Sequence, residues 1–184
     1  MSEAPPAPRP DDLRGIGLFG ALPDDVLAYL CQTLEGLEVG PGQLVFREGD
    51  SGRELFVVLE GRLEVLKRSS AGVDTPVASL GPHDWFGEMS VIDVQPRSAT
   101  VRALCPARLL RVRAADLDAL YRRDLKAYAL LVLNIARELS RRLRAADGLL
   151  VNFIADVMAF YVARGGGTEP PPPGDSAPPG GTRG

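Results

Sequence analysis

The spacing of apolar residues changes twice along the chain, from helical to strand-like and back to helical. Leu13 to Glu35 has the helical spacing, with a favourable helix start at Pro23 and an end at Gly36. From Leu37 to Arg113, short β-type runs alternate with turns rich in glycine, proline and aspartate. From Ala114 onward the spacing is helical again. Such regular turns between two helical regions predict an α+β fold built on a compact β barrel or roll.

The individual elements follow from the same pattern. A short helix is predicted at Ala115–Tyr121, followed by a longer helix that Asp124 caps. The apolar stripe of this longer helix continues past Gly148 to Tyr161, so the segment is either one long helix or two helices with a break at that glycine. The candidate strands are Gln43–Phe46, Glu54–Glu60, Arg62–Lys67, Pro76–Leu80, Ala99–Ala103 and Leu109–Arg113.

Glycine and proline mark the ends of the ordered region. The last 20 residues, from Gly165, hold seven glycines and six prolines. Such a segment buries too little apolar surface to offset its ordering entropy. We therefore expect disorder at residues 1–11 and 165–184, one domain over residues 12–146 and a helical extension over residues 147–164.

Charge and composition exclude several classes of protein. Lys and Arg number 21 and Asp and Glu 24, a formal charge of −3 that is too mild for a chain built around nucleic acid. One histidine and two cysteines are too few for a Cys/His metal site or a disulfide-dense scaffold. No apolar run reaches about 18 uninterrupted residues, and the start of the chain lacks the apolar core of a signal peptide. We expect a cytoplasmic protein with no membrane contact and no metal.

The run from Trp85 to Val101 carries the candidate chemistry. Gly87 allows a tight turn and a close approach of the backbone to a ligand. Glu88 to Ile92 is able to form a short helix whose first N–H groups are free to bind an anion. Arg97 adds a planar charged fork suited to phosphate, and Ser98 adds a hydroxyl donor. Because the carboxylate at position 88 accepts hydrogen bonds from sugar hydroxyls, the combination indicates a nucleotide pocket.

This run resembles the phosphate-binding cassette of the cyclic nucleotide-binding domain family, which includes bacterial catabolite activators, regulatory subunits of cyclic-AMP-dependent kinase and cyclic-nucleotide-gated channels. Phe86-Gly87-Glu88 and Pro96-Arg97-Ser98-Ala99-Thr100-Val101 match the two halves of its pattern. An earlier block also matches, with Gly40, Gly42, Phe46, Glu48-Gly49-Asp50, Gly52, Leu55-Phe56-Val57-Val58-Leu59 and Gly61-Arg62-Leu63-Glu64-Val65. The resemblance covers roughly Leu18 to Ala146. It implies a jelly-roll β-roll with a helix before it and a long helix after it.

The resemblance also implies roles for single residues. Glu88 accepts a hydrogen bond from the ribose 2′-hydroxyl, and Arg97 pairs with the cyclic phosphate. The long helix from Asp124 closes over the base as a lid. The other implied ligand-binding residues are Phe86, Gly87, Met89, Ser98 and Ala99 around the phosphate, Val57 and Val65 near the base, and Arg142 at the purine.

Other features narrow the expected function. In this family, serine at position 98 favours cyclic AMP, with cyclic GMP as the alternative. The chain has no nucleophile with a base and no metal cluster, so we expect no catalytic residue, no cofactor and no enzyme. The chain departs from the family at His83, where glycine is common. The segment after Leu143 is too short for the DNA-binding region of the catabolite activators, so we expect no DNA binding.

Two functions remain open. In the first, a cyclic nucleotide repacks the long helix and changes a surface that a separate, unknown effector protein reads. In the second, the roll is a structural or adaptor platform with weak or no nucleotide binding, and Glu88 and Arg97 form an ordinary internal salt bridge. The intact cassette favours the first function, whereas the absence of an effector from the chain favours the second.

The long helix has two further features that bear on partners. A cluster of basic residues is usually a solvated face, and a docking surface for an acidic partner is the alternative. The apolar stripe up to Tyr161 exceeds what one roll needs to cover itself, which predicts a homodimer through this helix. The basic residues are Arg122, Arg123, Lys126, Arg137, Arg141, Arg142 and Arg144, opposed by Asp124 and Glu138.

Overall fold

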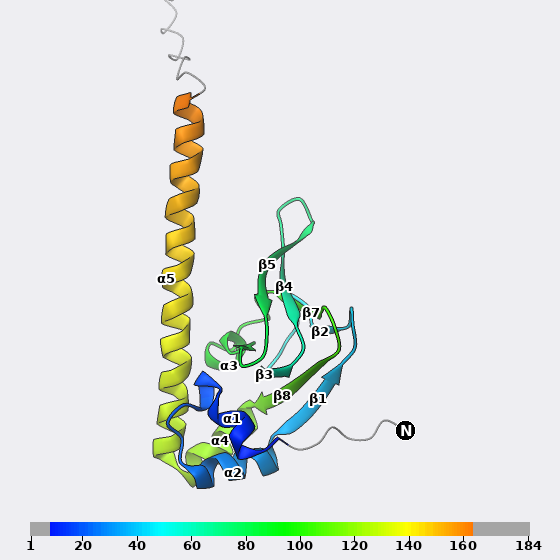
Figure 1. Ribbon diagram of the computed structural model, residues 1–184, viewed down its shortest axis with the longest axis vertical. Coiled ribbons are helices and arrows are strands. Elements are labelled where there is room, and N and C mark those ends of the chain that lie inside the picture. The colour runs from blue at the N-terminus through cyan, green and yellow to red at the C-terminus, as the bar shows by residue number, and fades with distance from the viewer. Residues whose placement is uncertain (1–7, 164–184) are drawn as a thin grey trace, which may run out of the picture. The chain divides into compact units, whose positions relative to one another are not determined.

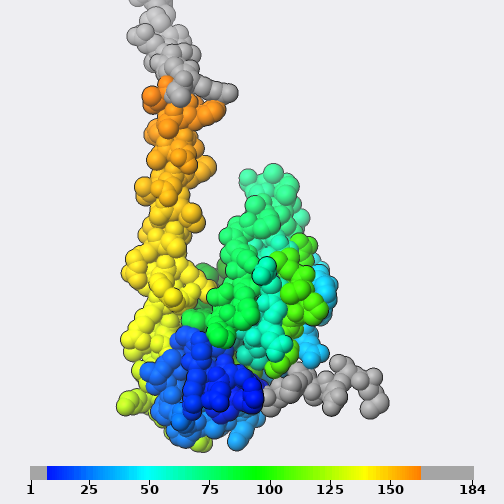
Figure 2. Space-filling model, in the orientation of Figure 1, coloured from blue at the N-terminus to red at the C-terminus, as the bar shows by residue number. Residues whose placement is uncertain are grey.

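The computed structural model describes residues 8–163, and in them two antiparallel sheets form a roll with helices packed beside it (Figure 1). One sheet has the strand order β1-β8-β3-β6 and the other β2-β7-β4-β5. The β4–β5 hairpin projects from the roll (Figure 2). The strands are β1 (Glu35–Val39), β2 (Leu44–Phe46), β3 (Glu54–Glu60), β4 (Leu63–Arg68), β5 (Asp74–Leu80), β6 (Trp85–Phe86), β7 (Thr100–Ala103) and β8 (Ala107–Arg113).

The sheet that contains β3 is buried on both faces. Successive side chains of a strand point to opposite faces. Phe56 and Val58 pack into the interior of the roll, whereas Leu55 and Val57 pack against the helices. This double burial explains why the centre of β3 is a continuous apolar run and does not alternate with polar residues.

The helices cover the outer face of this sheet. In the first part of α5, Ala127, Leu131 and Ile135 are buried, and Asn134 donates to the carbonyl oxygen of Leu18 at 3.1 Å. The face of α5 that carries these residues therefore belongs to the core of the domain, whereas Leu125, Val132 and Leu133 stay exposed. The helices are α1 (Pro10–Arg14), the 3-10 turn η1 (Gly17–Phe19), α2 (Asp24–Thr33), α3 (Met89–Ile92), α4 (Ala114–Arg123) and α5 (Leu125–Ala163).

The predicted α+β roll with flanking helices is confirmed, but the first helical region differs from the prediction. It divides into α1, η1 and α2, and the last helix ends at Thr33. Gly36, predicted as the helix end, lies in β1, opposite Leu110 of β8. Pairing with a distant strand therefore overrides the local helical pattern here. The sequence also missed β6, because two residues show no periodicity.

The long helix α5 is continuous through Gly148, which settles the alternative of two helices. Asp124 caps it as expected, because its carboxylate accepts from the backbone N–H of Ala127 at 3.0 Å. The chain forms two compact units with the boundary after Leu139, whereas the sequence analysis expected the domain to end at residue 146. The predicted tail at 165–184 and residues 1–7 lie outside the described residues, and α1 starts at Pro10, inside the segment expected to be disordered.

Among residues 8–163, one helix is long and apolar enough to cross a membrane by length and composition alone. It is α5, over Leu125–Val162, with a window of mean hydropathy 1.5 that is 0% buried within the structure. The sequence analysis did not identify this helix as a membrane span, because it required an uninterrupted apolar run. A helix whose apolar side chains are covered by another protein chain has the same composition, so this observation does not by itself indicate a membrane.

Two glycines in turns give a matched test of the roll. Gly61 and Gly72 both have positive φ, 93° and 78°. A Cβ at Gly61 would lie 2.5 Å from the Pro106 carbonyl oxygen, whereas a Cβ at Gly72 meets nothing within 4 Å. Both Gly→Ala variants lose about 1 kcal/mol from the left-handed backbone. We expect Gly61→Ala to lose roughly a further 1–3 kcal/mol through steric overlap, measured by urea unfolding. Equal losses in the two variants would contradict this account of the turn.

Candidate functional site

The guanidinium of Arg97 is buried at the centre of the site, where the residue is only 4% exposed. Its Nη1 donates to the backbone carbonyls of Glu54 and Gly87, at 2.7 and 3.1 Å, and to the Ser90 hydroxyl at 2.8 Å. Its Nη2 pairs with the Glu54 carboxylate at 3.3 Å. Three acceptors on one nitrogen hold the guanidinium in a fixed orientation.

An aromatic floor and two glycines complete this enclosure. The Arg97 guanidinium lies over the Phe46 ring, 4.1 Å from its centroid, in a cation–π contact. Phe46 in turn packs against the rings of Phe56 and Phe86, at 6.0 and 5.8 Å between centroids. A Cβ at Gly52 would fall on the guanidinium, and one at Gly87 would lie 2.7 Å from Nη1. Glycine at these two positions therefore makes room for the buried side chain.

One edge of the guanidinium is left for a ligand. The Nε of Arg97 is buried and has no hydrogen-bond partner among the described residues. Nε–H and one N–H of Nη2 point the same way, and this edge of an arginine matches two oxygens of a phosphate or carboxylate. Burial lowers the pKa of Arg97, while the carboxylates of Glu54, Asp50 and Glu88 act in the opposite direction. The arginine stays charged because its ordinary pKa lies far above neutral pH.

Backbone hydrogen bonds join the two motifs at this arginine. The N–H of Gly49 donates to the Arg97 carbonyl at 2.9 Å, and the N–H of Arg97 donates to the Asp50 carbonyl at 2.9 Å. The loop between β2 and β3 thus pairs with the cassette that follows α3. Two motifs about fifty residues apart in the sequence, the earlier block and the cassette, therefore form one site.

A second set of contacts anchors the cassette to β4. The Glu48 carboxylate accepts from Lys67 Nζ at 2.9 Å and from the backbone N–H of Arg68 at 3.0 Å. These bonds, the backbone one first, lower the pKa of Glu48. Lys67 also donates to the Ser98 carbonyl, and the hydroxyl of Thr100 accepts from the Glu48 N–H. Glu48 and Thr100 of the motifs therefore have structural roles at the edge of the site.

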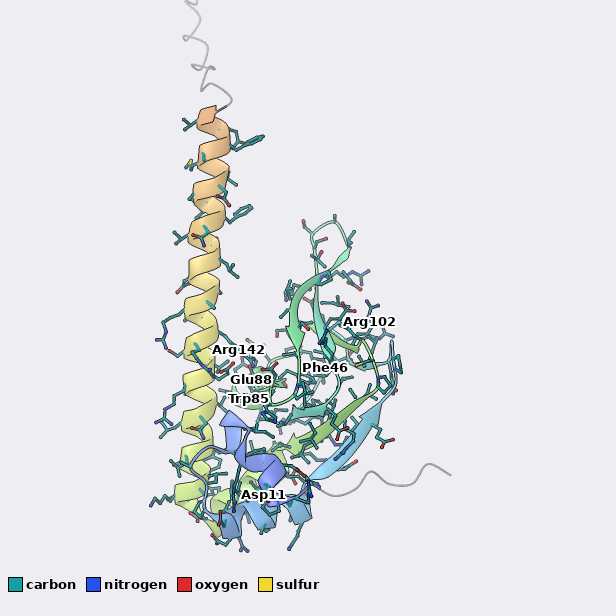
Figure 3. All side chains as sticks on the ribbon, viewed as in Figure 1. Asp11, Phe46, Trp85, Glu88, Arg102 and Arg142 are labelled. Atoms are coloured by element: carbon teal, nitrogen blue, oxygen red, sulfur yellow. The ribbon has the colours of Figure 1, made fainter. Side chains whose placement is uncertain are left out.

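Glu88 is the second buried charged residue of the site, with 3% exposure, and it lies directly before α3 (Figure 3). A carboxylate in this position accepts hydrogen bonds and contributes negative charge around Arg97. Met89 is 47% exposed, and Ser98 is also exposed, with its hydroxyl 3.6 Å from the Met89 sulfur. Ala99 is half-buried. The residues expected around a phosphate therefore lie in one region of the roll.

The two valines expected near the base differ in their placement. Val65 is half-buried at the margin of the roll interior. Val57 is 0% exposed and belongs to the core that the helices share with Trp85 and Leu110. The alternation of side chains along β3 explains this, because Phe56 and Val58 take the opposite face. Val57 therefore supports the strand from behind and does not line an open site in this structure.

Arg142, expected at the purine, lies on α5 in the compact unit that begins at Ser140. It is half-buried and has an interaction within the protein. Its contact with a base stays a prediction.

Sequence reasoning missed the site roles of Phe46, Gly52, Glu54 and Ser90. Phe46 and Gly52 were noted as motif positions, but nothing local in the sequence indicates that they contact Arg97. Ser90 lies within the short helix after Glu88, and its hydroxyl also donates to the Gly87 carbonyl at 3.0 Å. Glu54 reads as the polar first residue of a strand. Only the pairing of β3 with the cassette reveals it as a partner of the arginine.

The backbone conformation of the loop before the cassette shows why glycine is common in the family at the position of His83. This residue has φ of 75°, in the left-handed region that favours glycine. A histidine there costs of order 1 kcal/mol in backbone strain. Val94 within the cassette has φ of 58°, an unusual conformation for a β-branched residue. No group of three His, Cys, Asp or Glu side chains that could hold a metal ion occurs among residues 8–163.

Comparisons with known proteins agree with this geometry. Residues 37–124 match the family model described as the cyclic nucleotide-binding domain. The chain is 35% identical over 156 residues to the cyclic AMP receptor protein of Thermus thermophilus, covering 83% of this chain and 66% of that protein. It is 36% identical over 105 residues to a cyclic nucleotide-gated potassium channel of Mesorhizobium japonicum, covering 57% of this chain and 28% of the channel.

Solved structures support the same fold. A cyclic nucleotide-binding domain from Methylobacillus flagellatus superposes with a TM-score of 0.70 at 25% identity, covering 77% of this chain and 80% of that one. The chain spans about two thirds or less of the length of the curated relatives it matches. The residues that match the family model, 37–124, include the cassette.

Proposed function

Because the chain belongs to the cyclic nucleotide-binding domain family, we propose that its roll is a regulatory module that binds cyclic AMP. The observation that carries the proposal is the enclosed Arg97, which is anchored on one side and offers its Nε–Nη2 edge on the other. A cyclic phosphate has two exocyclic oxygens and one negative charge, which suit this edge. Buried Glu88 supplies the acceptor for a ribose hydroxyl.

Further contacts to the ligand follow from the same placement. The backbone N–H groups of Gly87, Ser98 and Ala99 are directed at the phosphate, and the Ser98 hydroxyl adds a donor. Val65 contacts the base. The serine and the similarity to a protein named as a cyclic AMP receptor favour cyclic AMP over cyclic GMP. The module works in the cytoplasm, has no catalytic role, and passes its signal to a separate effector protein.

The signal passes through the start of α5. A cavity of about 350 Å³ lies among α3, α4 and α5, lined by Val91, Leu117, Tyr121 and Tyr128 among others. Ligand binding at the cassette moves α3, and the cavity gives Val91 and Tyr128 room to repack. The free energy for a new position of α5 comes from the difference in nucleotide affinity between the two arrangements.

Calorimetric titration with cyclic AMP and cyclic GMP tests the binding site. We expect binding that Arg97→Ala weakens by about 30-fold or more, because the substitution removes a buried, charge-assisted phosphate contact. Arg108→Ala is the matched control, since Arg108 pairs with Glu60 at 2.6 Å elsewhere on the roll. It should bind like the parent protein. Absence of heat with either nucleotide, from folded and ligand-free protein, would reject the proposal in favour of the adaptor function.

The exposed side chains of α5 support a homodimer as the active form. A seven-residue repeat runs through the helix with apolar residues at every core position, as in a coiled coil. In a parallel pair, Arg142 of one copy faces Asp147 of the other, since these residues occupy flanking positions of the repeat. The core positions are Leu125, Ala129, Val132, Ala136, Leu139, Leu143, Ala146, Leu150, Phe153, Val157 and Phe160.

Neighbouring substitutions on α5 test the dimer. Leu150 is a core position of the repeat and 58% exposed, whereas Val151 is an outer position and 65% exposed. We expect Leu150→Lys to weaken dimerisation by about tenfold or more in sedimentation, because it places two charges in the helix–helix contact. Val151→Lys should leave dimerisation unchanged. A monomeric parent protein, or binding to lipid vesicles that both variants weaken alike, would contradict the dimer.

A further inference from the structure

A carboxylate of the protein already contacts Nη2, one of the two nitrogens at the phosphate-facing edge of Arg97. Glu54, the first residue of β3, has its Oε1 at 3.3 Å from Arg97 Nη2. The Arg97 side chain is 2% exposed and the Glu54 side chain 32% exposed. The pair therefore consists of a buried cation and an anion that reaches it from the solvent side.

The other nitrogens of Arg97 show why this contact matters. Nη1 is held by three acceptors, so the guanidinium does not turn to offer a different edge. A phosphate that binds both Nε and Nη2 shares the Nη2 nitrogen with the Glu54 carboxylate. The two anions then lie close together on one nitrogen and repel each other.

Charge strengthens this competition. Asp50 and Glu88 also act on Arg97 electrostatically, so a single buried cation already faces three carboxylates. A phosphate that enters adds a further negative charge close to Glu54, in a region where solvent screens charges poorly. Before any ligand binds, however, Glu54 contributes to compensating a buried arginine, whose charge would otherwise destabilise the fold.

We propose that Glu54 is an internal competitor that sets the nucleotide affinity of the site. It occupies Nη2 of Arg97 while the site is empty, and the cyclic phosphate displaces it toward solvent. The exposure of its side chain leaves it room to turn away. The inference rests on the proposed function and adds a consequence to it: the module responds only at nucleotide concentrations higher than those a neutral residue at this position would require.

Substitution of glutamate by glutamine tests this role with a matched control on the same strand. Glu54→Gln keeps the size of the side chain and an oxygen for Nη2 but removes the charge. Glu60→Gln makes the same change at the other end of β3, where Glu60 pairs with Arg108. In calorimetric titration with cyclic AMP, we expect Glu54→Gln to bind about 5- to 20-fold more tightly than the parent protein. Glu60→Gln should bind within about twofold of the parent, which controls for net charge.

The outcomes separate this inference from the proposed function. Equal or weaker binding by Glu54→Gln, with measurable binding by the parent protein, overturns the role of Glu54 and leaves the proposed function standing. If Glu54→Gln binds the nucleotide and the other two proteins do not, Glu54 competes strongly enough to prevent measurable binding in the parent protein. No binding by any of the three folded proteins rejects the proposed function, and the role of Glu54 with it. A substitution that merely damages the structure lowers the nucleotide affinity, so a gain in affinity in Glu54→Gln indicates loss of competition by the Glu54 carboxylate.

Discussion

The buried guanidinium of Arg97 requires hydrogen-bond acceptors around it, because an uncompensated charge in this position would destabilise the fold by several kcal/mol. Two backbone carbonyls, a serine hydroxyl, an aromatic ring and a carboxylate meet this requirement. They come from the end of β2, the start of β3 and the cassette, so these segments must come together around the arginine. The same constraint that organises this part of the roll leaves Nε and Nη2 directed at a common edge.

The roll supports this arrangement from both faces of one sheet. The interior core places Phe56 and Phe86 beneath Phe46, which forms the floor under the arginine. The opposite core joins the same sheet to the helices, including the first part of α5. A change at the cassette therefore has a short physical route to α5, through α3 and the cavity beside it. The packing that stabilises the domain therefore also forms the proposed route of the signal.

Much of this could be predicted from the sequence, because some features are local. Turn residues and short β-type runs define the roll, and the cassette identifies Glu88 and Arg97 as the charged pair of the site. Features that depend on distant segments could not be predicted in this way. The pairing of β1 with β8 moved Gly36 from a helix end into a strand. The face of β3 that Val57 occupies, and the contact of Glu54 with Arg97, depend on which elements lie beside that strand. The helical form of α5 was readable, but what covers its exposed side chains was not, because a helix pattern does not identify a partner.

The most direct test of the account is the 15N-detected Nε–H signal of Arg97 during titration with cyclic AMP. Among the described residues, the Nε atoms of both Arg97 and Arg111 are buried without an acceptor. Arg111 of β8 pairs with Glu35 of β1 and serves as the internal reference. An Arg97→Lys variant identifies the signal by its loss. The account predicts that the Arg97 signal shifts on saturation, because Nε gains a phosphate oxygen, while the Arg111 signal stays in place. Saturable binding with an unchanged Arg97 signal would show that the phosphate binds elsewhere and would contradict the account.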